Sequence, residues 1–150
     1  MGPDWSAPAI RRLYSCAERQ GEGDMDKKKP WIGVDLDGTL AHFDTWHGIE
    51  HVGEPIGPMM ARVREWLARG VVVKIFTARA SVEEPLRSDV ITHIHAWLVL
   101  HGLPPLEVTC VKDLWMKEMW DDRAIQVIPN TGISIADELT AERAAQAGKP

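Results

Sequence analysis

Two short apolar segments, each ending at a polar residue, constrain the fold of this chain more than any other feature. Residues 31–34 (Trp-Ile-Gly-Val) stop at Asp35, and residues 71–76 (Val-Val-Val-Lys-Ile-Phe) stop at Thr77. Short, mostly apolar runs of this kind are typical of strands buried in a parallel sheet. Residues 58–69, between them, carry apolar side chains at helical spacing and begin with a proline. The pattern therefore predicts a strand, a helix and a second strand in succession.

The same alternation continues downstream. We expect a helix over about 85–101, a strand over 106–111, a short helix over 113–118 and a short strand over 124–128. Right-handed crossovers between parallel strands place all strand C-termini along one edge of the sheet, where ligands bind. The prediction is an α/β, Rossmann-like three-layer sandwich with a mainly parallel central sheet. Five polar residues should gather at its edge: Asp35, Thr77, Lys112, Asp121 and Asp122.

The chain is expected to form one domain with two tails. Its 150 residues, 45% of them hydrophobic, suffice for one core, which we assign to residues 31–135. Residues 1–30 show no sustained periodicity and have the composition of a flexible extension, with at most a short helix over 10–17. Met25, just before the first strand, is a candidate alternative start. Residues 136–150 are expected to form a C-terminal tail that could be helical.

Composition argues against several classes of protein. The formal net charge of −5 disfavours a broad basic surface for nucleic acid, so a small or locally contacted substrate is expected. Cys16 and Cys110 form no CxxC pair, which argues against a disulfide framework or a zinc site. No apolar run is long enough to cross a bilayer, and no secretory signal begins the chain. We expect a soluble, cytoplasmic protein with no membrane partner.

The strongest chemical signal is the segment after the first strand, Asp35-Leu36-Asp37-Gly38-Thr39-Leu40. Two carboxylates followed by Gly-Thr suit a loop that leaves the sheet sharply and presents N–H groups to an anion. Asp35 could attack phosphorus, while Asp37 could protonate the leaving oxygen and later activate water. The alternative is an ordinary acidic turn, since Asp-Gly is a common turn dipeptide.

This segment resembles the first motif of the haloacid-dehalogenase superfamily of phosphatases. Residues 76–79 (Phe-Thr-Ala-Arg) are similar to its second motif, in which a hydroxyl group binds the transferring phosphoryl group. Lys112 is similar to the family's lysine, and residues 120–123 (Trp-Asp-Asp-Arg) to its acidic fourth motif, which holds Mg²⁺. The resemblance covers residues 31–132, with the motifs in the family's order.

The resemblance implies a Mg²⁺-dependent phosphomonoester hydrolase that works through an aspartyl phosphate. The implied catalytic residues are Asp35, Asp37, Thr77 and Lys112. The implied metal ligands are Asp35, Asp121, Asp122 and the main-chain carbonyl of Asp37. Gly38, Thr39, Ala78 and Arg79 would contact the substrate, although Arg79 could instead neutralise nearby acidic groups. A phosphotransferase with the same residues and a non-catalytic binding module of the same fold remain alternatives. A dehalogenase is disfavoured, because it would not need Asp37 as an acid/base.

Residues 41–58, here called the flap, are too few to form a large cap domain, so the site should be open. Trp46 and His47 are the candidates to contact the substrate beyond its phosphate. A metal site made of His42, His47 and His51 is less favoured than flap histidines that shape the site. The expected substrate is a phosphorylated small molecule or a nucleic-acid end. The arrangement resembles small uncharacterised bacterial and phage members of the superfamily and the phosphatase half of polynucleotide kinase-phosphatases.

Overall fold

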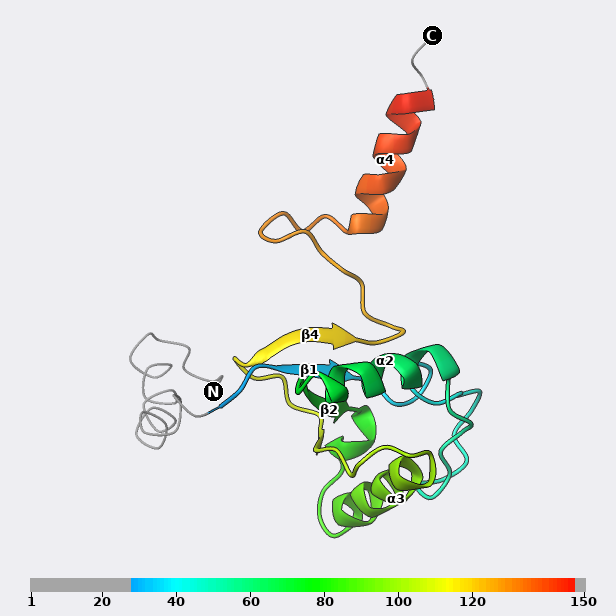
Figure 1. Ribbon diagram of the computed structural model, residues 1–150. Helices are drawn as coiled ribbons and strands as arrows, with labels where there is room; N and C mark the ends of the chain where they lie inside the picture. The colour runs from blue at the N-terminus through cyan, green and yellow to red at the C-terminus, as the bar shows by residue number, and fades with distance from the viewer. Residues whose placement is uncertain (1–27, 148–150) are drawn as a thin grey trace, which may run out of the picture.

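The computed structural model describes residues 28–147, which contain a four-stranded, all-parallel sheet (Figure 1). The strands are β1 (Trp31–Val34), β2 (Val72–Phe76), β3 (Val108–Thr109) and β4 (Met116–Trp120), in the spatial order β3-β2-β1-β4. The helical elements are α2 (Gly57–Ala68), the 3-10 turn η2 (Ala78–Ser81), α3 (Leu86–Leu100) and α4 (Ile135–Ala147). The predicted α/β class, with a parallel central sheet of Rossmann-like order, is confirmed.

Helices α2 and α3 share one face of the sheet. Their crossovers run from β1 to β2 and from β2 to β3, in the same direction, so right-handed connections place both on one side. Ile32 lies level with Val73, and Val34 with Ile75, so these side chains point toward the same face. That face and the two helices form one core cluster: Ile32, Val34, Val73, Ile75, Met60, Val63, Val90, Ile94, Trp97 and Leu98.

The opposite face is crossed by the extended segment 110–115, which leads from β3 to β4. Trp31 points to this face, is only 2% exposed and donates from Nε1 to Oδ1 of Asp113 over 2.8 Å. Gly33 also belongs here, because a Cβ on it would collide with the Met116 methyl group. In the part of the chain that the structure describes, this layer is therefore thin, and its apolar residues Val111 and Leu114 are 64% and 82% exposed.

The short helix predicted over 113–118 is wrong, because residues 116–120 form strand β4. The Asp113 carboxylate accepts hydrogen bonds from the N–H groups of Trp115 and Met116, which turns the chain into the strand. Parallel pairing with β1 then satisfies the backbone of β4. The strand lies at the edge of the sheet and exposes Lys117 and Glu118, charges that are typical of edge strands.

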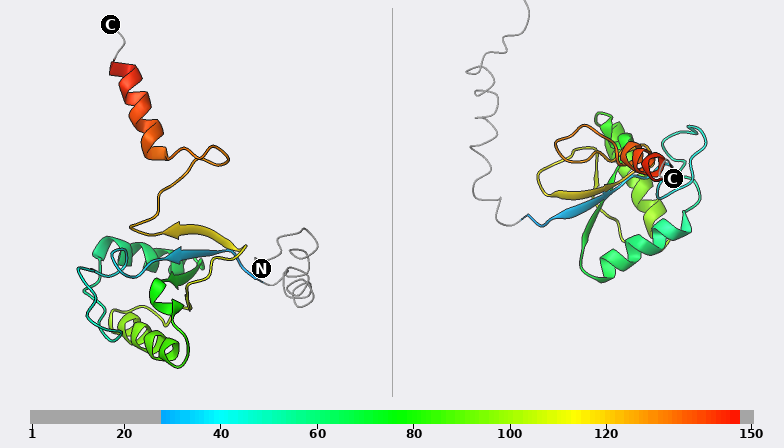
Figure 2. Two further views of the ribbon diagram at one scale, coloured as in Figure 1. Left: turned by 180° about the vertical axis from the view of Figure 1, so that it is seen from behind. Right: turned by 90° about the horizontal axis from the view of Figure 1, so that it is seen from above.

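The pairing of β4 with β1 contains a bulge. Trp31 lies level with Met116, but Ile32 lies level with Glu118, so Lys117 is an extra residue in β4. Beyond the bulge the register is regular, and Asp35 N–H donates to the Trp120 carbonyl over 2.8 Å. The arrows of β1 and β4 point the same way, so both strands end at the same edge (Figure 2).

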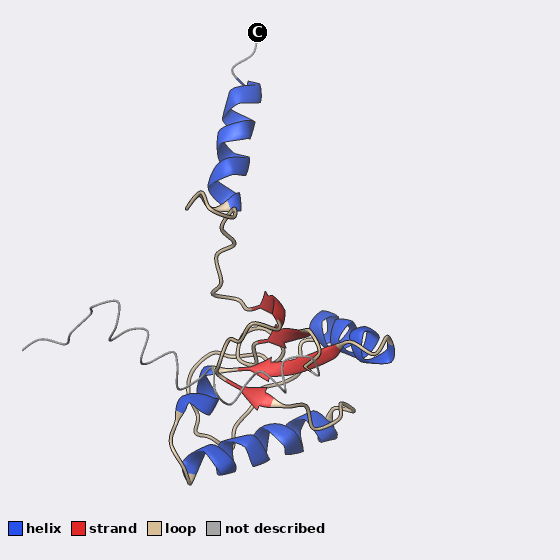
Figure 3. Ribbon diagram, turned by 90° about the vertical axis from the view of Figure 1, so that its left-hand side faces the viewer, coloured by secondary structure: helices blue, strands red, loops and turns tan. Residues whose placement is uncertain are grey.

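Residues past β4 differ from the prediction. The strand expected over 124–128 is absent from the described residues, where this segment makes only an isolated bridge between Val127 and Ser134. The predicted third strand, over 106–111, is reduced to two residues, since Val111 N–H bonds to the Thr109 hydroxyl instead of a strand. Helix α4 buries none of its residues and projects away from the sheet (Figure 3).

The flap runs from the loop after β1 to the start of α2 and, within residues 28–147, no cap domain accompanies it. Isolated bridges join Ala41 to Asp37 and to Pro55, and the flap's ends are thereby held together. None of the helices in the described residues is long and apolar enough to span a membrane. The proposed helix over 10–17, Cys16 and the candidate start Met25 all lie outside the described residues.

Candidate active site

Three carboxylates meet where β1 and β4 end. Asp35, Asp121 and Asp122 can each offer one oxygen, and these oxygens lie within 4.8 Å of one another. Burial, followed by the negative charge of Asp121, raises the pKa of Asp35 to about 7. A divalent cation would remove this repulsion, and Mg²⁺ prefers carboxylate oxygens. The cluster is therefore chemically suited to the predicted Mg²⁺.

The loop after β1 is folded tightly against the acidic pair. The N–H groups of Leu40 and Ala41 both donate to the Leu36 carbonyl, over 3.0 and 2.8 Å. Gly38 has a φ of 87°, and a Cβ there would lie 2.7 Å from an Asp122 carboxylate oxygen. The Thr39 hydroxyl accepts a hydrogen bond from Asp122 N–H over 3.0 Å. In this structure these two predicted substrate contacts, Gly38 and Thr39, lie against Asp122 and do not line the cavity described below.

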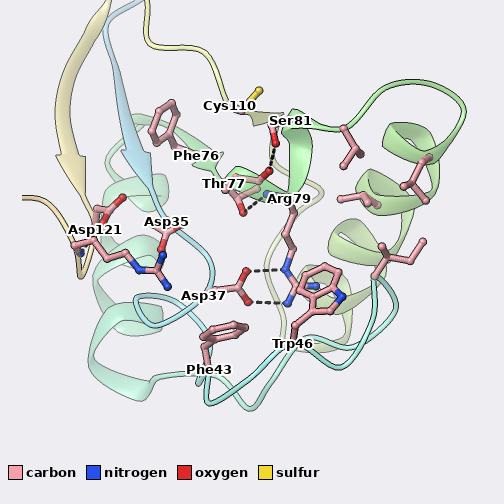
Figure 4. A pocket seen from close by; sticks show the side chains of 16 residues that line it. Asp35, Asp37, Phe43, Trp46, Phe76, Thr77, Arg79, Ser81, Cys110 and Asp121 are labelled. Carbon is pink, nitrogen blue, oxygen red and sulfur yellow. Dashed lines mark hydrogen bonds and ion pairs between the residues drawn. The ribbon is translucent and has the colours of Figure 1, made fainter.

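Asp37 forms a two-point ion pair with Arg79 (Figure 4). Nε of Arg79 donates to Oδ2 over 2.7 Å, and Nη2 donates to Oδ1 over 2.7 Å. The Arg79 side chain is only 4% exposed, and its Nη1 also donates to the His51 carbonyl over 2.9 Å. Its guanidinium carbon lies 4.7 Å from the centre of the Trp46 ring. Arg79 thus joins the loop after β1 to the flap.

The sequence leaves two roles open for Arg79, contact with the substrate and neutralisation of nearby acidic groups. In the structure its guanidinium group neutralises Asp37. It also contacts the flap, through the His51 carbonyl and the Trp46 ring. The only signal in the sequence was an arginine two residues after the polar end of a strand, which does not reveal its partner.

Thr77 directly follows β2 and is buried at the wall of the site, with 2% of its surface exposed. Its N–H donates to the Thr109 carbonyl over 2.9 Å, and its hydroxyl oxygen accepts from Arg79 N–H over 3.2 Å. The hydroxyl hydrogen can therefore be donated to a further acceptor, such as a phosphoryl oxygen. The next residue, Ala78, is exposed and lines the same cavity.

A cavity of about 680 Å³ lies beside the carboxylates. Its polar lining consists of Asp35, Asp37, Thr77, Arg79, Ser81, Asp121 and Arg123. Its apolar lining consists of Phe43, Trp46, Ile49, Phe76, Ala78, Val82, Leu86, Val90 and Cys110. The structure therefore brings together residues from the ends of β1, β2 and β4 with one predicted flap residue, Trp46.

Besides Gly38 and Thr39, three predicted site residues do not line this cavity: Asp122, Lys112 and His47. Lys112 is exposed in the segment between β3 and β4, and His47 lies on the outer part of the flap. His47 Nε2 is 3.3 Å from Oδ1 of Asp44, and its ring packs edge-on against His51. The cation that lines the cavity beside Asp121 is Arg123, whose main-chain N–H donates to Oδ1 of Asp121 over 2.7 Å.

The flap histidines form no metal-binding group in the described part of the chain, where the one group of potential ligands is the acidic cluster. His42 takes part in the flap through its backbone, since its N–H donates to the Glu54 carbonyl over 2.8 Å. His51 contributes its carbonyl oxygen to Arg79. The favoured interpretation, histidines that shape the flap, is consistent with these contacts.

Comparisons with known proteins add little. No family model matches the chain, and no curated protein matches it. Among solved structures, the chain is similar to a conserved protein from Bacteroides thetaiotaomicron, with 19% sequence identity and a TM-score of 0.46. The alignment covers 82% of this chain and the whole of that protein. A likeness this distant assigns neither family nor activity.

Proposed function

We propose that this chain is a Mg²⁺-dependent phosphomonoester hydrolase in which Asp35 accepts the phosphoryl group. The observation that carries the proposal is the cluster of Asp35, Asp121 and Asp122 at the edge of a cavity that also contains Thr77. Adjacent parallel strands supply these residues in the order of the phosphatase motifs. We further propose that the chain is a capless member of the haloacid-dehalogenase superfamily.

The proposed reaction has two displacements at phosphorus. Asp35, Asp121 and Asp122, with the Asp37 carbonyl as a further ligand by family likeness, would hold Mg²⁺, which supplies positive charge against the repulsion between carboxylate and phosphate. Thr77 donates its hydroxyl hydrogen to a phosphoryl oxygen. An Asp35 oxygen attacks phosphorus, and the ester oxygen leaves with the bonding electron pair and gains a proton. Water then attacks the aspartyl phosphate, releases phosphate and restores the carboxylate.

Asp37 is the proposed general acid and base, and its ion pair limits how it can act. Both of its oxygens accept hydrogen bonds from Arg79. To protonate a leaving oxygen, Asp37 would have to turn one of these oxygens away from Arg79 and toward the ester. To act as the base in the second displacement, Asp37 needs only one oxygen free to accept a proton from the attacking water. Substrates with good leaving groups should therefore react faster, because their departure needs less assistance.

The central test replaces the nucleophile. Asp35→Asn should lower kcat by roughly 10³-fold or more, because an amide is a poor nucleophile and a weaker metal ligand. Asp44→Asn, an exposed flap residue that does not line the cavity, is the matched control and should keep wild-type activity. Equal activity of the two variants would rule out Asp35 as the nucleophile. Rapid quenching and mass spectrometry should find the phosphoryl group on Asp35 in the wild type.

Two variations on the assay address the remaining alternatives. Adding glycerol as an acceptor would reveal a phosphotransferase, because glycerol phosphate would form at the expense of free phosphate. Lys112→Met, compared with Lys117→Met, tests the lysine role that the resemblance implies. Both lysines are exposed in this structure, so a selective loss of activity in Lys112→Met would show that Lys112 reaches the substrate during turnover.

A further inference from the structure

The cavity has an apolar end that phosphoryl transfer at Asp35 does not use. Its walls come from the flap, from the segment that leads into α3 and from the first turns of α3: Phe43, Trp46, Ile49, Val82, Leu86 and Val90. Asp35 and Asp121 lie on one side of the cavity, and Trp46 lies apart from them beside Arg79 (Figure 4). A polar end and an apolar end are thus separated within one site.

We propose that the substrate is the monophosphate ester of a neutral, ring-bearing alcohol no larger than a nucleoside. Its phosphate would lie at Asp35, and its ring would lie between Trp46 and Leu86. This inference rests on the proposed function, since it names the substrate class of the same site. The cavity volume of about 680 Å³ is within the usual range for small-molecule sites.

The charges in the cavity suit one phosphate group and no more. Its charged lining consists of three carboxylates and two arginines. Arg79 is already neutralised by Asp37, so Arg123 is the one arginine of this lining that forms no salt bridge among the described residues. No lysine of residues 28–147 lines the cavity. A second phosphate, or the backbone of a polynucleotide, would enter without a partner for its charge.

Trp46 is held in a position suited to contact a ring. One face of its indole lies against the Arg79 guanidinium, and that guanidinium is fixed by Asp37 and by the His51 carbonyl. Trp46 nevertheless remains 53% exposed, so much of its surface is available. A large aromatic surface that is already ordered loses little entropy on binding a planar group.

The experiment places a charge at the apolar end and leaves the carboxylates untouched. Leu86→Glu, at the start of α3, should lower kcat/KM for 1-naphthyl phosphate by roughly tenfold or more. Glycerol 3-phosphate, which has no ring to place there, should be affected far less. Leu100→Glu is the matched control, because Leu100 lies at the other end of α3 and does not line the cavity. It should behave as wild type with both substrates.

A binding measurement separates failure of this inference from failure of the proposed function. 1-Naphthylphosphonate has a carbon–phosphorus bond that a phosphatase does not hydrolyse, and calorimetry with Mg²⁺ reports its affinity without turnover. Binding that is weakened by Leu86→Glu and kept by Leu100→Glu supports the inference, even if the wild type hydrolyses no ester. No binding to the wild type, equal affinity for methylphosphonate, equal losses in both variants or a preference for a 5′-phosphorylated oligonucleotide would overturn it.

Discussion

Replacing Arg79 with methionine should destabilise the protein far more than the loss of an ordinary surface ion pair. The substitution keeps an unbranched side chain of similar length but leaves the Asp37 carboxylate without its two hydrogen bonds, and the His51 carbonyl without its donor. Removing one partner of a buried ion pair typically costs about 3–5 kcal/mol. The Asp37 side chain is still 18% exposed, so water can partly compensate, and we expect about 3 kcal/mol.

Urea unfolding followed by circular dichroism measures this cost, and a thermal scan should show a fall of roughly 12 °C at about 4 °C per kcal/mol. Arg69→Met is the matched control, because its pair with Glu65 joins two side chains that are 65% and 67% exposed. That variant should lose less than about 0.5 kcal/mol. Similar losses in the two variants would mean that the Asp37–Arg79 pair contributes nothing in solution.

A double variant tests the cause of the loss. In Asp37→Leu/Arg79→Met the buried carboxylate is gone together with its partner, so no unpaired charge remains. It should be more stable than Arg79→Met alone, because an apolar pair of similar volume often replaces an ion pair at little cost. A double variant less stable than either single one would show that packing against the flap, and not charge, dominates.

Three further predictions concern the carboxylate cluster. With Mg²⁺ removed, the free energy of unfolding should fall as the pH rises from 3.8 to about 7, because folded Asp35 keeps a proton that the unfolded chain has released. Calorimetry at several pH values should show that Asp35→Asn removes this dependence on pH. Above that range, Mg²⁺ at 100 times its Kd should stabilise the wild type by about 2.7 kcal/mol, which a rise in Tm would report. A similar rise in Asp121→Asn would contradict the assigned ligands. Gly38→Ala should cost roughly 1–2 kcal/mol more than Gly70→Ala in urea unfolding, because both glycines have positive φ but only Gly38 lies against Asp122.

The inner part of the fold could be predicted from the sequence. The observed bounds of strand β1 and helices α2 and α3 lie within one or two residues of the predicted ones. The spacing of their apolar side chains follows from which side chains are buried, so it predicts these elements. The edge strand β4 could not be predicted in the same way. Met116 and Trp120 flank charged residues that face solvent, which is equally compatible with a helical turn, and pairing with β1 decides the outcome. A pattern of side chains does not reveal a strand that is stabilised mainly by its backbone.

The candidate site likewise contains some residues that the sequence can place and others that it cannot. Asp35 and Thr77 could be placed because each follows a predicted strand, and strand ends meet at one edge of a parallel sheet. Asp121 follows β4, which the sequence pattern does not predict, so only the resemblance of residues 120–123 to the fourth motif points to it. The position of Lys112 depends on the path of the segment between β3 and β4, which no periodicity describes. The ion pair of Asp37 with Arg79 depends on how the flap folds over the sheet. These contacts link residues far apart in sequence, so the local pattern at either residue could not reveal them.

The bulge in β4 determines which residue can face Asp35. Because Lys117 is inserted without a partner, Val34 lies level with Trp120, and the two strands therefore deliver Asp35 and Asp121 as neighbouring first residues beyond the sheet. Continuing the pairing of Trp31 with Met116 without the insertion would place Val34 opposite Met119 and Asp35 opposite Trp120. One surplus residue near the start of an edge strand thus sets which residue of β4 reaches Asp35: a register slip that kept Lys117 and lost the bulge would exchange a carboxylate for an indole, whereas deleting Lys117 would remove the bulge and leave Asp121 in place.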